Sequence, residues 1–402
     1  MKIVHVEEFF HPDAGYQVNM LSRLQTLDGN EVTVVAAEMK KMPSSLTAFF
    51  GKEDVAQKDA AFERETGVRI VRVPLLAFYS GRAIFHPSVF RKVSAQAPDV
   101  VFVHGLETLT GMLFIRFSKW LKYPIVLDSH MLEMASRNRL RDQFAAFFRR
   151  YITPTILREN IPMIRVVDSD YVQKCLGIPL SHTDLLSFGT DTAHFSPDGE
   201  ARKVIRARHG IDENAFLVLY AGKLDDAKGG QFLANAIREK FATPPGRPIQ
   251  FMVIGTSDGP YGEEVERTFA RCENKLIRLP TQRYFDLAAF YQAADVAVFP
   301  RQCSLSFFEA QSCGLPALFE ENEINSQRAD SDNAFIFTPG NIEDLRCKVE
   351  WLAGLQAERF TEISGNARRH VLRHYDYVPI ARRFTGILQR AVNARANQTR
   401  TA

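Results

Sequence analysis

The segment from Phe299 to Pro316 contains the residues whose types and spacing are best suited to chemistry. It predicts the end of a buried strand, a loop and a short helix with Glu309 in its first turn. A carboxylate there can accept hydrogen bonds from ribose or sugar hydroxyls, and the free N–H groups and positive dipole of the helix start attract phosphate. We therefore expect Glu309, with Ser304, Leu305 and Ser306 before it, to contact both halves of a nucleotide.

The same segment also has a purely structural interpretation. Ser306 and Glu309 have the S-x-x-E spacing of a capping box, which only stabilises a helix start. Gly314 and Pro316 are ordinary signals for the end of a helix. The choice between the two interpretations depends on what the rest of the chain provides.

Two lysines flank a loop in the same half of the chain. The apolar run Leu217–Ala221 is followed by Gly222 and Lys223, and Lys228 comes five residues later, just before Gly229. Lysine is a flexible point charge suited to phosphate, and glycine lets the backbone approach a ligand. Two solvated surface lysines would give the same pattern, and the spacing is not that of a Walker loop.

Glycine and proline end two further apolar runs. Gly255 follows Phe251–Ile254, and Pro280 and Thr281 follow Leu276–Leu279. Backbone groups in such places can meet the base of a nucleotide, because ligands of open parallel sheets bind beyond the carboxyl ends of the strands. Plain turns would show the same residues, so both interpretations stay open.

The first half of the chain has a glycine and two histidines at comparable places. Gly15 precedes a helical pattern, which permits close approach of a phosphate to backbone N–H groups. His104 follows the run Val100–Val103, and His130 follows Ile125–Leu127 after Asp-Ser. A histidine there can donate to a substrate hydroxyl or to a developing charge, whereas a histidine with a structural role would stand in the same place. 

Near the start of the chain, four residues have the chemistry of metal ligands. They are His5, Glu7, Glu8 and His11. Their spacing matches no common metal site, so we do not predict one there.

Short apolar runs rich in β-branched residues alternate with longer helical patterns. Strands buried on both faces read as continuous apolar runs, and helices between them indicate parallel crossovers. The sequence therefore predicts an α/β protein with two doubly wound parallel sheets of about six strands each. The predicted strands are Ile3–Val6, Val32–Val35, Ile70–Val73, Val100–Val103, Ile125–Leu127, Ile164–Val167, Leu217–Ala221, Phe251–Ile254, Leu276–Leu279, Val296–Phe299, Ala317–Phe319 and Phe335–Phe337.

The alternation breaks at Ser187–Pro197, where Gly, Thr, Asp, Ser and Pro cluster as in a linker. We therefore divide the chain into an N-terminal domain, residues 1–187, and a C-terminal domain, residues 198–376. The final pattern, Val378–Val392, predicts an amphipathic helix that must bury one face. Its apolar residues are Ile380, Phe384, Ile387 and Leu388.

Composition and charge exclude several classes of protein. The 402 residues are 46% hydrophobic and 24% charged, as in an ordinary globular protein, and the net charge of +3 is too small to argue for nucleic acid. Five scattered cysteines without C-x-x-C spacing favour a reduced, cytoplasmic setting. The first residues lack the apolar run of a signal peptide, and no apolar stretch is long enough to span a membrane.

A basic and aromatic stretch, Arg137–Arg158, has two interpretations. It could lie against an anionic membrane surface, which would make the protein peripheral at the inner membrane face. A core helix with a solvated charged face would have the same composition.

Five segments resemble, in the right order, motifs of the retaining glycosyltransferases of family four, the large group also called glycosyltransferase group 1, which have the GT-B fold. Each motif is weak alone, but five in sequence are specific, and the resemblance covers nearly the whole chain. The segments are Gly29–Val34, Ser187–Pro197, Gly222–Gly229, Asp295–Pro300 and Glu309–Pro316.

The resemblance implies a domain for the acceptor and a domain for the nucleotide-sugar, both Rossmann-like and facing a cleft. The acceptor-side domain would be residues 1–187 with a returning helix at residues 377–395, and residues 198–376 would bind the donor. The implied reaction is transfer of a hexose-like sugar to a glycan, lipid-linked or other hydroxyl acceptor, as in polysaccharide biosynthesis. The anomeric configuration would be retained, without a metal ion or a cofactor.

The resemblance also implies roles for single residues. Glu309 would hold the ribose, while Lys223 and Lys228 would bind the diphosphate and neutralise it as it leaves. Gly15 would lie near the phosphates or the acceptor, and His130 would touch the transferred sugar. The leaving phosphate itself would take the proton of the acceptor.

The chain departs from the family pattern at the donor loop. Arg301 stands where the first glutamate of the family's E-x7-E motif is expected, and 302–304 replace a Gly-Phe-Gly run. Ala14 replaces the first glycine of the N-terminal loop, and Lys223 stands where arginine is commoner. Our hypothesis is that Arg301 pairs with an acidic donor sugar or with a phosphate.

Two other functional classes remain as alternatives. One is a non-catalytic protein that binds sugar nucleotides, which the replacement at Arg301 keeps open. The other is a nucleotide-sugar 2-epimerase, which needs acids and histidines placed for proton abstraction. The sequence shows no evident pair of that kind.

Overall fold

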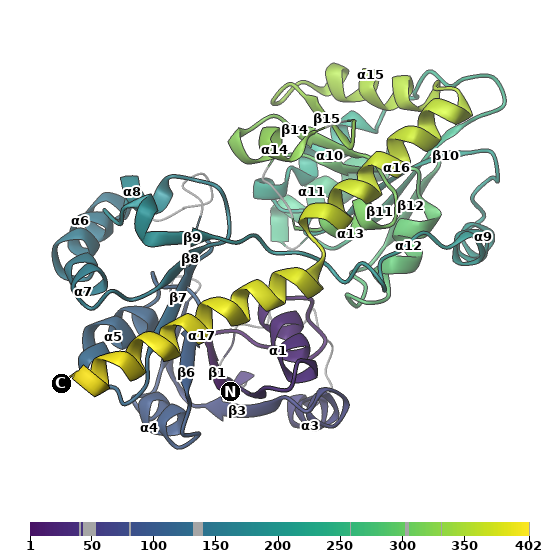
Figure 1. Cartoon of the computed structure of the whole chain (residues 1–402). Helices are drawn as coiled ribbons and strands as arrows, with labels where there is room; N and C mark the ends of the chain where they lie inside the picture. The colour runs from purple at the N-terminus through teal and green to yellow at the C-terminus, as the bar shows by residue number, and fades with distance from the viewer. Residues whose placement is uncertain are drawn as a thin grey trace. The chain divides into compact units, whose positions relative to one another are not determined.

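The computed structural model describes residues 1–39, 42, 54–79, 82–131, 140–257, 259–301, 305–330 and 332–401. The chain forms two compact units (Figure 1). Unit 1 is Met1–Phe188 with Tyr377–Ala402, and unit 2 is Gly189–Asp376. The first of the two unit boundaries lies inside the segment Ser187–Pro197, where the sequence predicts a linker.

Unit 1 is built on a parallel sheet of seven strands in the order β3-β2-β1-β6-β7-β8-β9. Strands β6 and β7 at its centre are fully buried and mostly apolar, as expected when helices cover a parallel sheet, although β7 ends in Asp128 and Ser129. The strands are β1 (Lys2–Glu7), β2 (Glu31–Ala37), β3 (Arg69–Val73), β6 (Val100–Val103), β7 (Ile125–Ser129), β8 (Met163–Arg165) and β9 (Thr183–Leu185).

Unit 1 differs from the sequence prediction in several parts, and β2 and β7 each end two residues later than their predicted runs. The edge strand β9 was not predicted, because it has three residues and two of them are exposed. The antiparallel pair β4 (Leu75–Tyr79) and β5 (Arg82–Phe85) was also not predicted. Strand β8 begins one residue earlier and ends two residues earlier than the predicted run Ile164–Val167.

Helices of unit 1 connect successive strands and end at recognisable signals. Asp54 caps α3 by accepting a hydrogen bond from Ala56 N–H, and Gly67 ends that helix with φ +72°. The helices are α1 (Gln17–Leu27), α3 (Val55–Thr66), α4 (Ser88–Ser94), α5 (Leu109–Phe117), α6 (Arg141–Tyr151), α7 (Thr153–Arg158) and α8 (Tyr171–Lys174), with 3-10 turns at Ser118–Trp120 and Leu180–His182.

The last helix, α17 (Tyr377–Thr401), belongs to unit 1 although unit 2 precedes it in the sequence. It packs on α1, β6 and β7, and it is drawn in yellow along that sheet in Figure 1. All four apolar positions that the sequence predicts for the buried face are at most 5% exposed. The ring of Phe384 lies 5.9 Å from that of Phe102 in β6.

Unit 2 is built on a parallel sheet of six strands in the order β12-β11-β10-β13-β14-β15. All six predicted strands of this half are confirmed, five of them to within one residue at each end, whereas β11 begins two residues before its predicted run. The strands are β10 (Phe216–Ala221), β11 (Ile249–Ile254), β12 (Leu276–Leu279), β13 (Val296–Phe299), β14 (Ala317–Glu320) and β15 (Ala334–Phe337).

Helices again separate the strands of unit 2. Before β13, the buried carboxylate of Asp295 pairs with Arg202 and Arg206 of α9, at 2.7 Å in both cases. The helices are α9 (Gly199–Arg208), α10 (Gly230–Ala236), α11 (Gly259–Phe269), α12 (Leu287–Ala293), α13 (Phe307–Ser312), α14 (Glu323–Arg328), α15 (Ile342–Ala353) and α16 (Ala357–His374), with a 3-10 turn, η6, at Asp226–Lys228.

Both sheets have the strand order of a doubly wound fold, which confirms the predicted fold class. In each sheet the order reverses beside the first strand, between β1 and β6 in unit 1 and between β10 and β13 in unit 2. Ligands of open α/β sheets bind beyond the carboxyl ends of the strands at such a reversal. Among the described helices, none has both the length and the apolar character that crossing a bilayer requires.

Candidate functional site

In unit 2, two glycines bring the ends of β10 and β11 into contact. Gly222 N–H donates to the carbonyl of Ile254 at 3.0 Å. Gly255 has φ +143°, and a Cβ atom on it would lie only 1.8 Å from the carbonyl oxygen of Gly222. Only glycine fits there, so the residue predicted to contact the ligand also sets the path of the loop that follows β10.

The loop after β10 carries both predicted lysines. Lys223 is exposed and Lys228 is half-buried. The side chain of Asp225 accepts a hydrogen bond from Lys228 N–H at 2.9 Å and caps the turn η6. Gly229 then reverses the chain with φ +74°, and α10 begins at the next residue. The backbone around Lys228 is therefore fixed by a cap on one side and a left-handed glycine on the other.

Arg301 follows β13, the strand that pairs with β10. Its side chain contacts the loop after β10, residues 222–229, which we call the lysine loop. Its Nη1 donates to the Asp226 carboxylate at 2.7 Å and to the Asp226 carbonyl at 3.0 Å. A Cβ atom on Gly229 would lie 3.2 Å from Arg301 Cγ. Arg301 itself has φ +59°, a strained conformation for a residue with a side chain. No role is predicted for Asp226, because nothing in the sequence shows that it meets a residue 75 positions later.

Glu309 lies in α13 and is only 6% exposed. Its Oε1 accepts a hydrogen bond from Tyr284 Oη at 2.9 Å. Burial raises the pKa of Glu309 to about 7, although the hydrogen bonds from Tyr284 and Thr190 act to lower it. A buried carboxyl whose pKa is shifted in this way is a candidate for a functional group.

The remaining predicted residues of unit 2 lie around these groups. Ser306 is the N-cap of α13 but makes no side-chain capping hydrogen bond, so the capping-box interpretation is wrong. Leu305 is 47% exposed, and Ser304 lies outside the described residues. After β12, the Pro280 carbonyl accepts a hydrogen bond from Gln282 at 2.7 Å, and Thr281 Oγ1 lies 3.4 Å from Thr256 Oγ1 beside Gly255.

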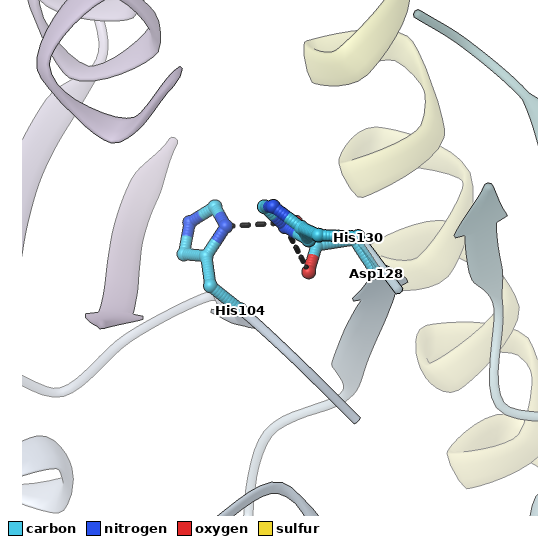
Figure 2. A group of neighbouring side chains, drawn as sticks. All are labelled: His104, Asp128 and His130. Atoms are coloured by element: carbon cyan, nitrogen blue, oxygen red, sulfur yellow. Dashed lines mark hydrogen bonds and ion pairs between the residues drawn. The ribbon is translucent and has the colours of Figure 1, made fainter. Parts of the chain in front are cut away.

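In unit 1, the ends of β1, β6 and β7 carry a connected set of polar side chains. His5 in β1 and His104 after β6 face each other, with 2.9 Å between His5 Nδ1 and His104 Nε2. His104 Nδ1 lies 2.8 Å from Asp128 Oδ2, and His130 Nε2 lies 2.8 Å from Asp128 Oδ1 (Figure 2). The two histidines that the sequence analysis singled out, His104 and His130, are thus joined by one carboxylate.

Charges in this group perturb one another strongly. Burial alone would raise the pKa of Asp128, but the charges and hydrogen bonds of His130 and His104 outweigh it and hold that pKa well below its usual range. Burial alone would lower the pKa of His130, but Asp128, Glu7 and Glu107 outweigh it and raise that pKa. Burial also raises the pKa values of Glu7 and Glu107.

The three side chains in Figure 2 also have the types of atoms that bind a metal ion. One ligand atom from each of His104, Asp128 and His130 lies within 4.8 Å of the others. Each of the two histidine nitrogens is, however, already at hydrogen-bond distance from an oxygen of Asp128. The arrangement is therefore that of a carboxylate shared by two imidazoles.

Gly15 lies two residues before α1, whose N-cap residue is Tyr16. Of the four residues near the start whose chemistry suits a metal, His5 bonds to His104 and Gln25, while His11 Nδ1 accepts a hydrogen bond from Asp13 N–H at 3.2 Å. Glu8 accepts a hydrogen bond from Ala83 N–H through Oε2. The absence of a metal site among these four residues stays a prediction.

Comparisons with protein families match both halves of the chain. A model described as "Glycosyl transferase 4-like domain" matches residues 14–156, and one described as "Glycosyl transferases group 1" matches residues 215–354. Together these ranges cover more than half of the chain.

Among curated proteins, the D-inositol 3-phosphate glycosyltransferase of Pseudarthrobacter chlorophenolicus is 30% identical over 147 residues, which are 35% of this chain and 34% of that protein. The protein of the same name from Rhodococcus opacus is 27% identical over 251 residues, 58% of this chain and 55% of that protein. The chain thus spans between about a third and a little over half of the length of these relatives.

Solved structures show the same fold over nearly the whole chain. A glycosyltransferase from Rickettsia africae has a TM-score of 0.73 at 12% identity, over 97% of this chain and 98% of that one. HepE from Anabaena, solved in complex with UDP and glucose, has a TM-score of 0.70 at 17% identity, over 97% and 99% of the two chains. From its motifs, its two sheets and these matches, the chain belongs to the group 1 glycosyltransferases, with the GT-B fold.

Proposed function

We propose that this protein transfers a sugar from a nucleoside-diphosphate donor to a hydroxyl acceptor, with retention of configuration and without a metal ion. The observation that carries the proposal is the loop after β10, where Asp225 and Gly229 fix the backbone at Lys228 beside the strand reversal of unit 2. A cation held there suits a diphosphate, because ligands of such sheets bind beyond these strand ends. The structure of HepE with UDP and glucose supports a nucleotide ligand for this fold.

In this proposal, unit 2 holds the donor. Glu309 accepts hydrogen bonds from the ribose hydroxyls, while Lys223 and Lys228 contact the diphosphate. The backbone near Gly255, Pro280 and Thr281 lies at the neighbouring strand ends and suits the base. Unit 1 provides the acceptor side, with His130 and the loop that contains Gly15.

The reaction exchanges one bond for another at the anomeric carbon of the sugar. The bond from that carbon to the diphosphate oxygen breaks, and a bond to the acceptor oxygen forms on the same face. The acceptor proton passes to the leaving phosphate. As the bond breaks, negative charge grows on the phosphate and positive charge grows on the sugar ring, so fixed cations such as Lys228 act where charge appears.

The test is release of nucleotide from UDP-, GDP- and ADP-sugars, with and without acceptors. The acceptor panel includes a cyclitol phosphate, of the kind named for the curated relatives, and lipid-linked saccharides. A transferase releases nucleotide only with an acceptor. An epimerase converts the donor alone, and a non-catalytic binding protein does neither although the nucleotide raises its melting temperature. Either of the last two results contradicts the proposal.

Arg301 suggests which donor sugar unit 2 prefers. Its Nη1 is engaged by Asp226, and its side chain is 45% exposed, so the rest of the guanidinium faces solvent. We propose that this edge pairs with an anionic group, the carboxylate of an acidic sugar, because a planar guanidinium suits a carboxylate.

Arg301→Glu, which restores the family's residue, should lower kcat/KM for a uronic-acid donor about tenfold or more relative to the matching neutral hexose donor. An unchanged ratio refutes the hypothesis.

We also propose that unit 1 touches an anionic membrane surface through α6 and α7. Phe147 and Tyr151 on α6 are 45% and 59% exposed, whereas Phe148 of the same helix is fully buried. Arg150 lies beside Tyr151, with its guanidinium carbon 5.4 Å from the ring centroid. Aromatic rings and arginines on one exposed face favour the interface of anionic lipids, here at the cytoplasmic face.

Co-sedimentation with lipid vesicles tests this contact. The protein should bind vesicles that contain phosphatidylglycerol and should dissociate from them as the salt concentration rises. It should not bind vesicles of pure phosphatidylcholine. Phe147→Ser with Tyr151→Ser should abolish binding, while Leu27→Ser, at an exposed apolar residue of α1, should leave it unchanged. Binding that is equal for both lipids, or indifferent to the double substitution, contradicts the proposal. Residues 137–139 of the predicted stretch lie outside the described residues.

A further inference from the structure

A line of buried polar contacts runs through unit 1 from α1 to the end of β7. Gln25 Oε1 lies 2.7 Å from His5 Nε2, and the line continues through His104 and Asp128 to His130. The first four side chains are at most 4% exposed, and only His130, with 36% of its side chain exposed, reaches solvent. These five polar residues come from three strand ends and one helix, and burying them is costly. Their hydrogen-bonding groups must therefore find partners within the same network.

The carboxylate of Asp128 fixes the directions of these hydrogen bonds. It accepts from Gly105 N–H at 2.7 Å through Oδ1, and both of its oxygens face a histidine nitrogen. Its low pKa keeps it ionised, and an ionised carboxylate is an acceptor only. His104 Nδ1 and His130 Nε2 must therefore both carry a proton.

The far side of His104 allows two proton arrangements. If His5 Nε2–H donates to Gln25 Oε1, then His5 Nδ1 accepts from His104 Nε2–H, and His104 is an imidazolium ion paired with Asp128. If the Gln25 amide turns by 180°, its buried and unpartnered Nε2 can donate to His5 instead, and His104 is neutral. In both arrangements His104 Nδ1–H donates to Asp128. The hydrogen bond that holds the carboxylate is therefore the same whichever arrangement is present.

At the other end, the ring of His130 is held between Asp128 and Phe188, whose ring centroid lies 5.1 Å away. Its Nε2–H is taken by Asp128, and His130 Nδ1 makes no hydrogen bond with the described residues. The charges that face this ring are Asp128, Glu7 and Glu107, with Arg82 acting on Glu107. An imidazole bound on one edge by a carboxylate presents its other nitrogen in a single orientation.

We propose that Asp128, braced by His104 and His5, is the positioning residue that orients His130 and directs its Nδ1 edge to the substrate. This inference rests on the proposed function, in which unit 1 receives the acceptor and the transferred sugar. Asp128 does not touch the reacting atoms and acts through the imidazole. Asp128 favours the protonated form of His130 by raising its pKa, and in that form Nδ1–H donates to a substrate oxygen as charge develops.

Asp128→Asn tests the proposal. An amide can accept from one histidine but must donate to the other, so one hydrogen bond of the line breaks, and the negative charge on His130 is lost. We expect kcat to fall on the order of 100-fold, with nucleotide binding to unit 2 unchanged. Activity should also be lost at a lower pH than in the wild type as pH rises, because the pKa of His130 is no longer raised by Asp128.

The matched control is Asp184→Asn, which makes the same change at a partly exposed carboxylate of unit 1 paired with Arg390. It should leave both kcat and the pH profile unchanged. A second readout is the ¹⁵N spectrum of the imidazoles, which reports the protonated nitrogens directly. In the wild type His130 should carry a proton on Nε2, and in Asp128→Asn its ¹⁵N shifts should change.

Three results overturn the proposal. The first is a wild-type His130 whose Nε2 carries no proton, which can be measured even if Asp128→Asn does not fold. The second is an Asp128→Asn protein with an unchanged pH profile and unchanged ¹⁵N shifts. The third is parallel loss of activity and nucleotide binding, which indicates a merely structural role. If no acceptor supports transfer in the wild type, the proposed function fails, while the ¹⁵N measurement still decides the positioning.

Discussion

Lys228 is the residue whose removal separates function from stability most directly. Its side chain is half-buried, and its backbone is fixed by the Asp225 cap, which an alanine keeps because the cap uses the N–H group. Lys228→Ala should lower kcat/KM about 100-fold, through loss of a cation near the leaving phosphate. The free energy of unfolding should change by less than about 0.5 kcal/mol. The control is Lys203→Ala, a surface lysine of α9. Equal loss of activity and stability would show that Lys228 is structural.

The raised pKa of Glu309 should make the stability of the folded protein fall as pH rises. Its pKa is raised in the folded protein to about 7, so the folded state holds a proton that the unfolded state gives up above its pKa of 4.5. Folding stability is therefore lost as pH rises from about 4.5 to 7 and stays low above it. Glu309→Gln removes this loss, and at pH 8 it should be more stable than the wild type by up to about 3 kcal/mol.

The measurement is the melting temperature of both proteins at pH 5 and pH 8, with nucleotide binding measured beside it. The stability advantage of Glu309→Gln should vanish at pH 5, where the wild-type carboxyl is protonated. The variant should bind nucleotide more weakly at pH 8, because an amide accepts hydrogen bonds from hydroxyls less strongly than a carboxylate does. A variant that is equally stable at pH 8 and binds nucleotide normally would contradict both roles assigned to Glu309.

At the scale of elements, the turn η6 and the start of α10 together fix the backbone position of Lys228. Gly229→Ala would force a side chain into φ +74° and place its Cβ 3.1 Å from Pro300 Cβ. Backbone strain alone costs about 1–2 kcal/mol, and the crowding against β13 adds to it. We expect a larger loss of stability than that, together with weaker nucleotide binding.

Gly246 gives the matched control for this element. It has φ +75°, but a Cβ atom there would meet nothing within 4 Å. Gly246→Ala should therefore show the strain cost without any change in nucleotide affinity. Calorimetric titration with UDP and GDP, combined with urea unfolding, separates the two effects. If both variants behave alike, the contact between the lysine loop and Arg301 has no role in binding.

At the scale of the molecule, the last helix decides the stability of unit 1. Phe384 in α17 is fully buried and meets Phe102 in β6, although these residues are far apart in the sequence. Phe384→Ala should cost about 3–5 kcal/mol and should destabilise unit 1. The control is Val378→Ala on the same helix, where the side chain is 41% exposed. Hydrogen exchange at β1 and β6 is the measurement, and faster exchange confined to unit 2 would contradict the assignment of α17.

Most of the fold could be predicted because buried parallel strands leave a local signal. Strands β10, β11 and β13 at the centre of unit 2 each contain a run of four or more apolar residues, and each predicted run of unit 2 became a strand. Strand β9 could not be predicted, because Thr183–Leu185 is short and half polar and pairs on one side only. The antiparallel pair β4 and β5 was also not predicted, because neither segment alone indicates that the two pair with each other.

The candidate site divides in the same way. By itself, the sequence determined which residues have phosphate, hydroxyl and proton chemistry, and that they stand at strand ends, because residue type and strand position are local properties. Only the tertiary structure decided which of them meet. His5 and His104 are 99 positions apart, and Arg301 and Asp226 are 75 apart. The physical reason is that strand order brings distant strand ends together, and this order depends on packing of the whole sheet rather than on any one segment.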